Sequence, residues 1–506
     1  MGIISTNVKF NKNSLKANFS LNKPNQASLA LGTPKFSFDN RRFFRTKKSY
    51  PIPNLPLINE MVEVVPSPRL HDLSKTAVIG VQHMLETTLN LFTGMQQLGV
   101  KPQNMYFTGK CYSSSPEVET AIVKQKIHLM PTTTPKIIGQ YHKHCQDIME
   151  KMWNFCLEDI KRKKIERLII LDEGGRCLEA MPENVSFEYE VAGIEQTRAG
   201  LYSNIMDNHL FPVVDVASSA AKKRLEPALI AEAVLSRVVK TLKNLNLKQD
   251  AVCGVVGNGA IGSGVVKYLL SKGYKVVTYD ENEDAFQKIY SRNLFRVGKI
   301  EDVIVNAQYI FGCTGKDITQ GINFLDIAKK DKVFISCSSE DKEFLSLLRR
   351  IAHNGALIDP MSDVSCVSNS GSKILILKGG FPINFDRTPS SVPANDIELT
   401  RGLLLGAFLQ AVDVAKKPIG DGITINQFSH QQLNPYVQKF IVNNWINRQP
   451  TDRYPNELIG CFDDIEWIKK NSGGEYYPNE YLEEIFSKNQ QQDIILPAST
   501  LRLAVQ

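Results

Sequence analysis

Short apolar runs alternate with stretches of helical periodicity along most of the chain. Residues 76–100 open with a strand-like run that passes into an amphipathic helical pattern, and residues 228–245 carry apolar residues at every fourth position. This alternation is typical of parallel strands joined by helices that cover both faces of a sheet. The other segments with strand character are 166–175, 210–219, 307–315, 332–339, 355–360 and 373–380.

Residues 252–282, VCGVVGNGAIGSGVVKYLLSKGYKVVTYDEN, carry the most specific pattern. An apolar run leads into a glycine-rich turn, a helical stretch and a second apolar run that ends at Asp280. In a dinucleotide-binding unit, Gly257 makes the tight turn, Gly259 lets backbone N–H groups approach a pyrophosphate, and Gly262 lets the helix pack against the strand. The residues predicted to surround the pyrophosphate are Gly257, Asn258, Gly259, Ala260, Ile261 and Gly262.

The residues around Asp280 indicate which dinucleotide binds. A carboxylate at the end of the second strand hydrogen-bonds the adenosine ribose hydroxyls of NAD. Glu281, Glu283 and Asp284 follow it and would repel the 2′-phosphate of NADP, and no arginine stands nearby in the sequence to receive that phosphate. The sequence therefore predicts NAD as the cofactor.

These patterns predict an α/β protein with two doubly wound parallel-sheet domains, the second of them a Rossmann NAD-binding domain. Ligands of such sheets bind at the carboxyl ends of the strands. The expected parts are a disordered basic tail over 1–50, a first α/β domain over 51–248 to which 393–445 return, the Rossmann domain over 249–392, and a C-terminal extension over 446–506.

Composition narrows the class of protein. The tail carries ten lysines and arginines against one acidic residue, whereas the rest of the chain is slightly acidic although the whole carries +7. We therefore expect no nucleic-acid binding by the folded body. The most apolar stretch, 403–415, follows Arg401 and contains Asp413, so no membrane span is expected.

The cysteines and histidines bear on compartment and metals. Nine cysteines without any C-x-x-C pair favour free thiols in a reducing compartment, and we expect a cytoplasmic protein. His142, His144 and Cys145 resemble metal ligands, but no second cluster at ligand spacing accompanies them, so no metal site is expected.

Several separated segments, in the same order, resemble the S-adenosylhomocysteine hydrolase family. They lie between residues 70 and 415 and include LIILDEGG, GIEQTRAGLYSN, VDVASSAAKKRLEPALIAEAV, the glycine unit, FGCTG and GGFPIN. The resemblance implies a two-domain fold with bound NAD and a small-molecule substrate, and a homo-oligomer is compatible with it. In that family NAD transiently oxidises a nucleoside 3′-hydroxyl, which permits elimination of homocysteine at C5′, addition of water and reversal of the oxidation.

The resemblance assigns catalytic roles residue by residue. Lys222 matches the lysine that acts on the sugar hydroxyls, and Glu226 stands in place of its aspartate partner one helical turn later. His83 matches the histidine of the substrate domain. Glu173 takes the place of the second aspartate in an Asp-Asp-Gly-Gly run that begins here at Asp172, which is expected to bind substrate.

Further matches lie on the substrate and cofactor sides. Gln196 replaces a substrate-binding glutamate, and Thr197 matches a threonine that contacts the nicotinamide end. The matching segments FGCTG and GGFPIN supply Thr314 and Asn384 as expected cofactor contacts. Ser339 stands where the family has a histidine, which is a departure from the pattern.

Three functions remain open. The preferred one is an adenosylhomocysteinase-like enzyme that uses tightly bound NAD for transient oxidation of a nucleoside thioether or related small molecule. The second is a non-catalytic NAD-binding regulatory homologue. The third is an NAD-dependent hydroxyacid-type dehydrogenase, which needs an arginine and a histidine–carboxylate pair in the cofactor domain, where the only histidine is His353.

Overall fold

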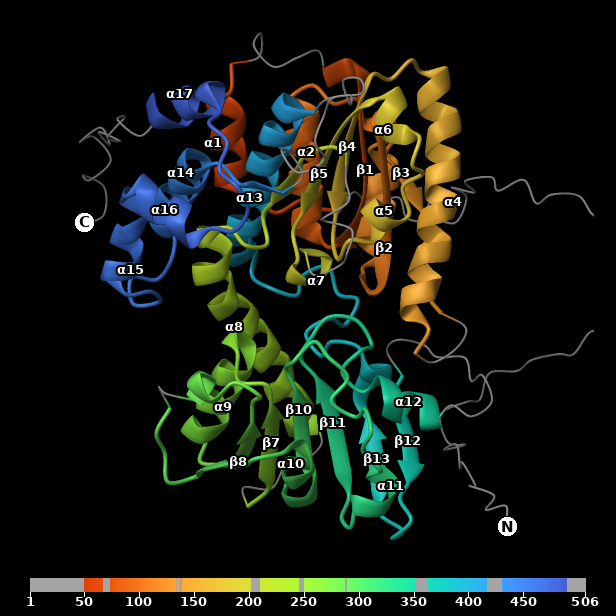
Figure 1. Ribbon diagram of the computed structural model, residues 1–506, viewed down its shortest axis with the longest axis vertical. Helices are drawn as coiled ribbons and strands as arrows, with labels where there is room; N and C mark the ends of the chain where they lie inside the picture. The colour runs from red at the N-terminus through yellow and green to blue at the C-terminus, as the bar shows by residue number, and fades with distance from the viewer. Residues whose placement is uncertain are drawn as a thin grey trace, which may run out of the picture.

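The computed structural model describes residues 50–66, 73–132, 134–135, 139–201, 210–244, 250–286, 289–351, 362–415 and 430–488. Apart from Tyr50, the expected disordered tail lies outside these ranges, as do the expected strand at 355–360 and His353. The described part forms two sheets that lie one above the other in Figure 1. None of its helices is long and apolar enough to cross a membrane.

The first sheet has seven strands in the order β14-β6-β5-β4-β1-β2-β3, with every neighbouring pair parallel. All six positions of its central strand β4 are buried, as expected for a strand covered by helices on both faces. The strands are β1 (Thr76–Met84), β2 (Met105–Ser114), β3 (His128–Met130), β4 (Arg167–Asp172), β5 (Glu190–Glu195), β6 (Val213–Asp215) and β14 (His430–Gln432). The helices of this stretch are α1 (Pro56–Val64), α2 (Glu86–Gln97), α3 (Pro116–Lys124), α4 (Tyr141–Arg162), α5 (Arg176–Glu179), α6 (Val185–Glu188) and α7 (Arg198–Leu201).

The second sheet also has seven strands, in the order β12-β13-β11-β10-β7-β8-β9. Its strands are β7 (Val252–Val256), β8 (Lys275–Tyr279), β9 (Leu294–Arg296), β10 (Tyr309–Gly312), β11 (Lys332–Ser336), β12 (Val364–Val367) and β13 (Lys373–Ile376). Its helices are α9 (Ala260–Ser271), α10 (Ile300–Asn306), α11 (Phe324–Ile327) and α12 (Leu345–Ile351).

The two sheets confirm the predicted α/β fold with a Rossmann domain. One pair departs from the all-parallel expectation in the described part: β12 runs antiparallel to β13 at the edge of the second sheet. The reason is that residues 368–372 join them as a short turn, whereas parallel strands need a longer crossover.

Two long helices connect the parts. Helix α8 (Ala220–Asn244) follows β6 and runs between the two sheets in Figure 1, packing against both α9 and residues of 394–414. Helix α13 (Ala394–Val414) follows the second sheet and packs against β4, β5 and β6 of the first. Because every residue of α13 from 398 to 412 is buried, this helix forms the centre of the first sheet's core.

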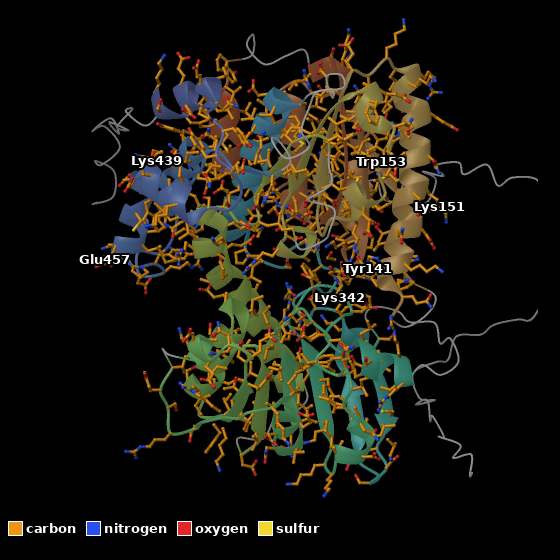
Figure 2. The ribbon with its side chains drawn as sticks, viewed as in Figure 1. Tyr141, Lys151, Trp153, Lys342, Lys439 and Glu457 are labelled. Carbon is orange, nitrogen blue, oxygen red and sulfur yellow. The ribbon has the colours of Figure 1, made fainter. Side chains whose placement is uncertain are left out.

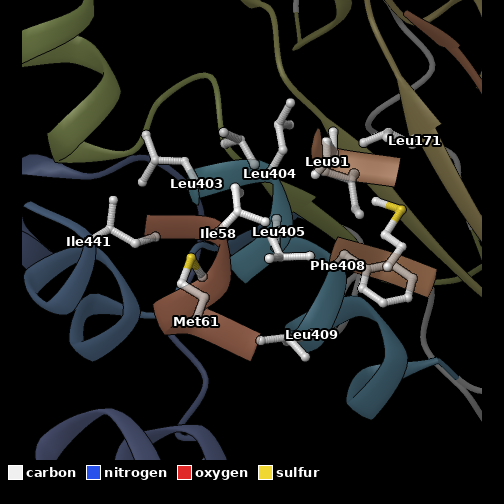
Figure 3. Close-up of a cluster of buried hydrophobic side chains, with 14 of the residues drawn as sticks. Ile58, Met61, Leu91, Leu171, Leu403, Leu404, Leu405, Phe408, Leu409 and Ile441 are labelled. Carbon is white, nitrogen blue, oxygen red and sulfur yellow. The ribbon is translucent and has the colours of Figure 1, made fainter. Parts of the chain in front are cut away.

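Figure 3 shows the core around α13, where Leu405 lies close to Ile58 and Met61 of α1, with Ile441 beside them. The C-terminal helices are α14 (Pro435–Ile446), α15 (Asn456–Gly460), α16 (Ile465–Asn471) and α17 (Glu480–Lys488). They bury Ile468 and Phe486 in the same core. Residues that had no assigned role from sequence are therefore part of the packing around the first sheet.

The two sheets meet through residues that follow their strands. Arg176, after β4, donates from Nη2 to both carboxylate oxygens of Glu340, after β11, at 3.0 Å each. Tyr112 of β2 packs on Phe381, beyond β13, with ring centroids 5.2 Å apart. Figure 2 labels Lys342, beside Glu340, close to this junction. The carboxyl ends of the two sheets therefore face each other.

Candidate active site

The glycine turn of the second sheet is built for close approach. Gly257 has φ of +89°, a left-handed conformation that favours glycine, and its N–H donates to the Tyr279 carbonyl at 2.9 Å. A Cβ on Gly262 would lie 1.8 Å from the Gly257 carbonyl oxygen, so the helix can approach the turn only with glycine there. A Cβ on Gly259 would meet nothing within 4 Å, because this residue borders open space.

That space is a cavity of about 350 Å³ at the carboxyl ends of β7, β8 and β10, within the range of small-molecule sites. Asp280 at its edge accepts hydrogen bonds from the backbone N–H groups of Asn258 and Asn282. Helix α9 begins at Ala260 without a side-chain cap, so its first N–H groups are free to bind an anion. The cavity is lined by Val256, Gly257, Gly259, Tyr279, Asp280, Glu281, Ile300, Cys313, Thr314, Lys316, Asp317 and Ile318.

These features fit the adenosine and pyrophosphate parts of NAD. Gly257, Gly259, Asp280 and Thr314 line the cavity, as a dinucleotide site requires. The side chain of Asn258 instead points away and donates from Nδ2 to the Ala285 carbonyl at 2.6 Å.

Two residues of this site were missed in the sequence. Glu343 is buried and holds the 313–315 loop, accepting from Thr314 N–H at 2.9 Å and from Gly315 N–H at 2.8 Å. Lys316 at the cavity wall pairs with Glu281 at 2.7 Å. Neither residue lies in the glycine unit, and the loop conformation that brings them to the cavity has no sequence signature.

The first sheet presents a charged cluster where its strand order reverses, at β1 and β4. Glu173, after β4, accepts at Oε1 from Lys110 Nζ of β2 at 2.8 Å and lies 2.7 Å from His83 Nε2 of β1. His83 Nδ1 in turn contacts the hydroxyl of Ser113. Reversal points of this kind are where open α/β sheets bind ligands.

Burial and pairing set the charges in this cluster. Burial lowers the pKa of His83, and the neighbouring Glu173 carboxylate opposes this effect. Burial alone would raise the pKa of Glu173, but His83 and Lys110 outweigh it and hold that pKa well below its ordinary value. The second oxygen of Glu173, Oε2, is buried without a hydrogen-bond partner.

A second pair lies on α8. Lys222 Nζ donates to Glu226 Oε1 at 2.8 Å, and both side chains are about 15% exposed or less. Thr400 of α13 donates to the same Glu226 oxygen at 2.6 Å, which fixes the carboxylate between the two helices. The one-turn spacing read from the sequence is therefore a direct contact.

The remaining substrate-side residues shape the loop after β4. Glu195 accepts from Gly174 N–H at 3.1 Å, Gly175 N–H at 2.8 Å and Thr197 Oγ1 at 2.7 Å. Asp172 lies opposite Glu195 on the neighbouring strand. Burial, and then the charge of Asp172, raise the pKa of the Glu195 carboxyl to about 8.

Asp172 itself accepts from the backbone N–H groups of Glu173 and Leu178 at 2.7 and 2.8 Å, so it orders this loop. Thr197 is bonded to Glu195, and Gln196 is buried with Oε1 lacking a partner. Of the residues expected to touch substrate or nicotinamide, Asp172 and Thr197 therefore support the loop that carries Glu173, whereas the Gln196 amide oxygen has no partner in the described part of the chain.

The cofactor and substrate sides come together through the segment after β13. Asn384 is buried, and the ring of the next residue, Phe385, stacks on His83 with centroids 4.6 Å apart. The structure thus brings His83 to Glu173, Lys222 to Glu226, and Asn384 to the neighbourhood of His83. Among the residues that it describes, no group of three or more His, Cys, Asp or Glu side chains could hold a metal ion.

Comparison with known proteins supports the cofactor assignment. Residues 252–355 match the family model of the NAD binding domain of 6-phosphogluconate dehydrogenase. Together with the glycine turn and its cavity, this match makes the second sheet an NAD-binding Rossmann domain. The finer resemblance to the S-adenosylhomocysteine hydrolases rests on the sequence segments.

Two matching proteins, described as uncharacterized and from two strains of Mycobacterium tuberculosis, are each 28% identical over 408 residues, covering 78% of this chain and 74% of theirs. A D-2-hydroxyisocaproate dehydrogenase structure matches with 13% identity and a TM-score of 0.25, covering 52% of this chain and 71% of that one. A pyruvate reductase of Chlamydomonas reinhardtii matches with 12% identity and a TM-score of 0.29, covering 57% and 77%.

Proposed function

We propose that the protein is an NAD-dependent enzyme that oxidises an alcohol carbon of a small molecule bound where the carboxyl ends of the two sheets face each other. The observation that carries the proposal is the Lys222–Glu226 contact of 2.8 Å, largely buried on the helix that joins the sheets. An ordinary ion pair on a helix surface is exposed to solvent and contributes little to stability. The Lys222–Glu226 pair is shielded from solvent, which favours a chemical role.

NAD bound to the glycine turn supplies a hydride acceptor. The residues of the chain must then handle the proton of the substrate hydroxyl, and Lys222 is placed to take or relay it. Glu226 orients the lysine, and the Thr400 hydroxyl holds Glu226 through the same oxygen. The balance is a hydride from the alcohol carbon to NAD, the hydroxyl proton to the Lys222–Glu226 pair, and a carbonyl product.

A second candidate follows from the His83–Glu173 contact of 2.7 Å. Alcohol oxidation needs one proton acceptor, whereas elimination and hydration in the manner of the adenosylhomocysteine hydrolases need a second acid–base group. His83, whose Nε2 lies against the Glu173 carboxylate, fits that role. In this reaction the oxidation is reversed, so no reduced cofactor accumulates.

Absorbance at 340 nm separates the two candidates. NAD-loaded protein is mixed with hydroxyacids and with nucleoside thioethers such as S-adenosylhomocysteine, and product release is followed alongside. Lasting NADH formation supports the oxidoreductase. Product release without net NADH supports the redox-recycling reaction. Compounds that bind by calorimetry without either signal would contradict both and favour the non-catalytic NAD-binding homologue.

A further inference from the structure

Arg401 of α13 occupies an unusual position between the two acid–base pairs. Arg401 comes directly after Thr400, whose hydroxyl donates to Glu226. The Nε of Arg401 donates to Thr87 Oγ1 of α2 at 3.1 Å. Both Glu173 and Glu226 act on its pKa in the raising direction, and Arg401 in turn lowers the pKa of His83. The guanidinium therefore lies within electrostatic reach of both pairs.

Arg401 has no counter-ion in the described part of the chain. The residue is 4% exposed, yet no carboxylate oxygen there lies within the 4.0 Å of an ion pair, and its hydrogen bonding is confined to Nε. The two carboxylates whose charges act on Arg401 already have other partners, Glu173 with Lys110 and Glu226 with Lys222. Nη1 and Nη2 have no hydrogen-bond partner in the described part of the chain and are not fully enclosed.

A buried cation without a partner is strongly unfavourable, and proteins pair such charges or use them for ligands. Burial lowers the pKa of Arg401 to about 10, which still leaves it charged at neutral pH. Its bond to Thr87 holds the planar group in one orientation. Two parallel N–H donors on a fixed plane match the oxygens of a carboxylate or phosphate group.

We propose that Arg401 binds an oxyanion group of the substrate, so that the alcohol oxidised beside Lys222 belongs to a carboxylate- or phosphate-bearing molecule. This inference rests on the proposed function for the identity of the reaction. The binding of the anion itself does not require turnover, so the two can fail separately.

The test is calorimetry on the full-length protein saturated with NAD, which keeps anions from the pyrophosphate site. The probes are oxalate, inorganic phosphate, and oxamide as the uncharged analogue of oxalate. We expect at least one anion to bind and oxamide to bind far more weakly. Arg401→Gln should weaken anion binding on the order of a hundredfold, and Arg401→Lys should do so less because it keeps the charge without the paired donors.

Arg453→Gln is the matched control. Arg453 also contacts α13, but it is already paired with Asp396, so its loss should leave anion affinity unchanged. Melting temperatures check folding: because Arg401→Gln removes an unpaired buried charge, it should melt no lower than the wild type without anion, and anions should no longer raise its melting temperature.

The two anions distinguish the possible substrates. Tighter oxalate binding identifies a carboxylate substrate, and tighter phosphate binding a phosphorylated one. Equal anion affinity in Arg401→Gln, equal binding of oxamide, or no binding of either anion would overturn the inference. If anions bind through Arg401 but no alcohol reduces NAD, the proposed function is overturned and the inference stands. If alcohols are oxidised equally well with and without an anionic group, the inference is overturned and the proposed function stands.

Discussion

The sites at the carboxyl ends of the two sheets differ in the residues that form them and in how far apart those residues lie in the sequence. At the second sheet, the lining of the cavity over Gly257 includes two glycines and three carboxylate residues, and apart from Ile300 and the 313–318 loop it comes from residues 256–281. At the first sheet, the cluster around Glu173 consists of charged side chains from separate strands and helices, between His83 and Arg401 in sequence. Most of the cofactor site thus comes from residues close together in the sequence, whereas the substrate-side cluster combines residues that are distant in the sequence.

The two edges share one device. A buried glutamate side chain accepts backbone hydrogen bonds from the loop beyond the strand ends in each sheet: Glu343 from the 313–315 loop, and Glu195 from Gly174 and Gly175. These hydrogen bonds give the buried glutamate oxygens partners, and they also fix the conformation of the loop. Because a buried glutamate holds the loop at both edges, the two edges differ in the residues that the loops present to a ligand.

The largest expected effect is on the substrate side. Lys222→Ala should lower turnover of any substrate found by the 340 nm screen by about two to four orders of magnitude, because a positioned proton acceptor is lost. NAD affinity should be unchanged, since Lys222 lies outside the glycine turn. Steady-state kinetics and NAD titration measure the two quantities.

Lys223→Ala is the control in the same helix, because Lys223 is exposed and bonds the Asn471 carbonyl at 2.9 Å. It should keep normal turnover. Normal turnover in Lys222→Ala as well would mean that the Lys222–Glu226 pair is structural. It would contradict the assignment of the proton transfer to the first sheet's side of the site.

On the cofactor side, Asp280→Ala should weaken NAD about thirty- to a hundredfold, or roughly 2 to 3 kcal/mol, because two charge-assisted hydrogen bonds to the ribose are lost. Glu283→Ala, which removes an exposed carboxylate outside the cavity lining, should have little effect. Calorimetry gives both affinities, and an unchanged affinity in Asp280→Ala would remove this carboxylate from the site.

Adding one methyl group should also damage the cofactor side. Gly262→Ala places a Cβ 1.8 Å from the Gly257 carbonyl oxygen, so α9 must shift away from the turn. We expect a loss of about 1 to 3 kcal/mol in the free energy of unfolding and weaker NAD binding. Gly298→Ala, whose Cβ would meet nothing within 4 Å, should be nearly neutral in urea denaturation. Equal stability of the two variants would contradict the close packing.

The last prediction concerns the pH dependence of folding stability, whose change within any one pH unit is small. The folded pKa of Glu195, about 8, lies above its ordinary value of 4.5, so the folded protein binds the proton more tightly than the unfolded chain. This contribution to stability is complete below about pH 4.5 and is lost as pH rises through about 8, by at most about 1.4 kcal/mol per pH unit. Urea denaturation from pH 5 to 8.5 should show the decline, and Glu195→Gln should flatten it. The same slope in that variant would assign the decline to other groups.

The same comparison explains what could be predicted from sequence. The turn from Gly257 to Gly262 and its carboxylate were readable because their roles depend on spacing within one strand–turn–helix unit. Lys222 and Glu226 were readable for a similar reason, since one helical turn separates them. The parallel sheets followed from the alternation of apolar runs and helical periods.

Lys110 and Arg401 could not be assigned in this way. The contact of Lys110 with Glu173 depends on the order of β1, β2 and β4, which no local pattern specifies. Arg401 did leave one signal, because a charged residue directly before the apolar stretch 403–415 would be buried if that helix were central. The packing of the C-terminal helices on α13 was hidden for the same reason, since it depends on contacts between distant segments.

The most direct test of the account is a crystal structure of the protein with NAD. The account predicts the adenosine ribose at Asp280, the pyrophosphate at the start of α9, and the nicotinamide ring directed to the first sheet, beside the Lys222–Glu226 pair. A nicotinamide ring directed away from that pair, with the adenosine still at Asp280, would contradict the claim that the two edges act on one substrate.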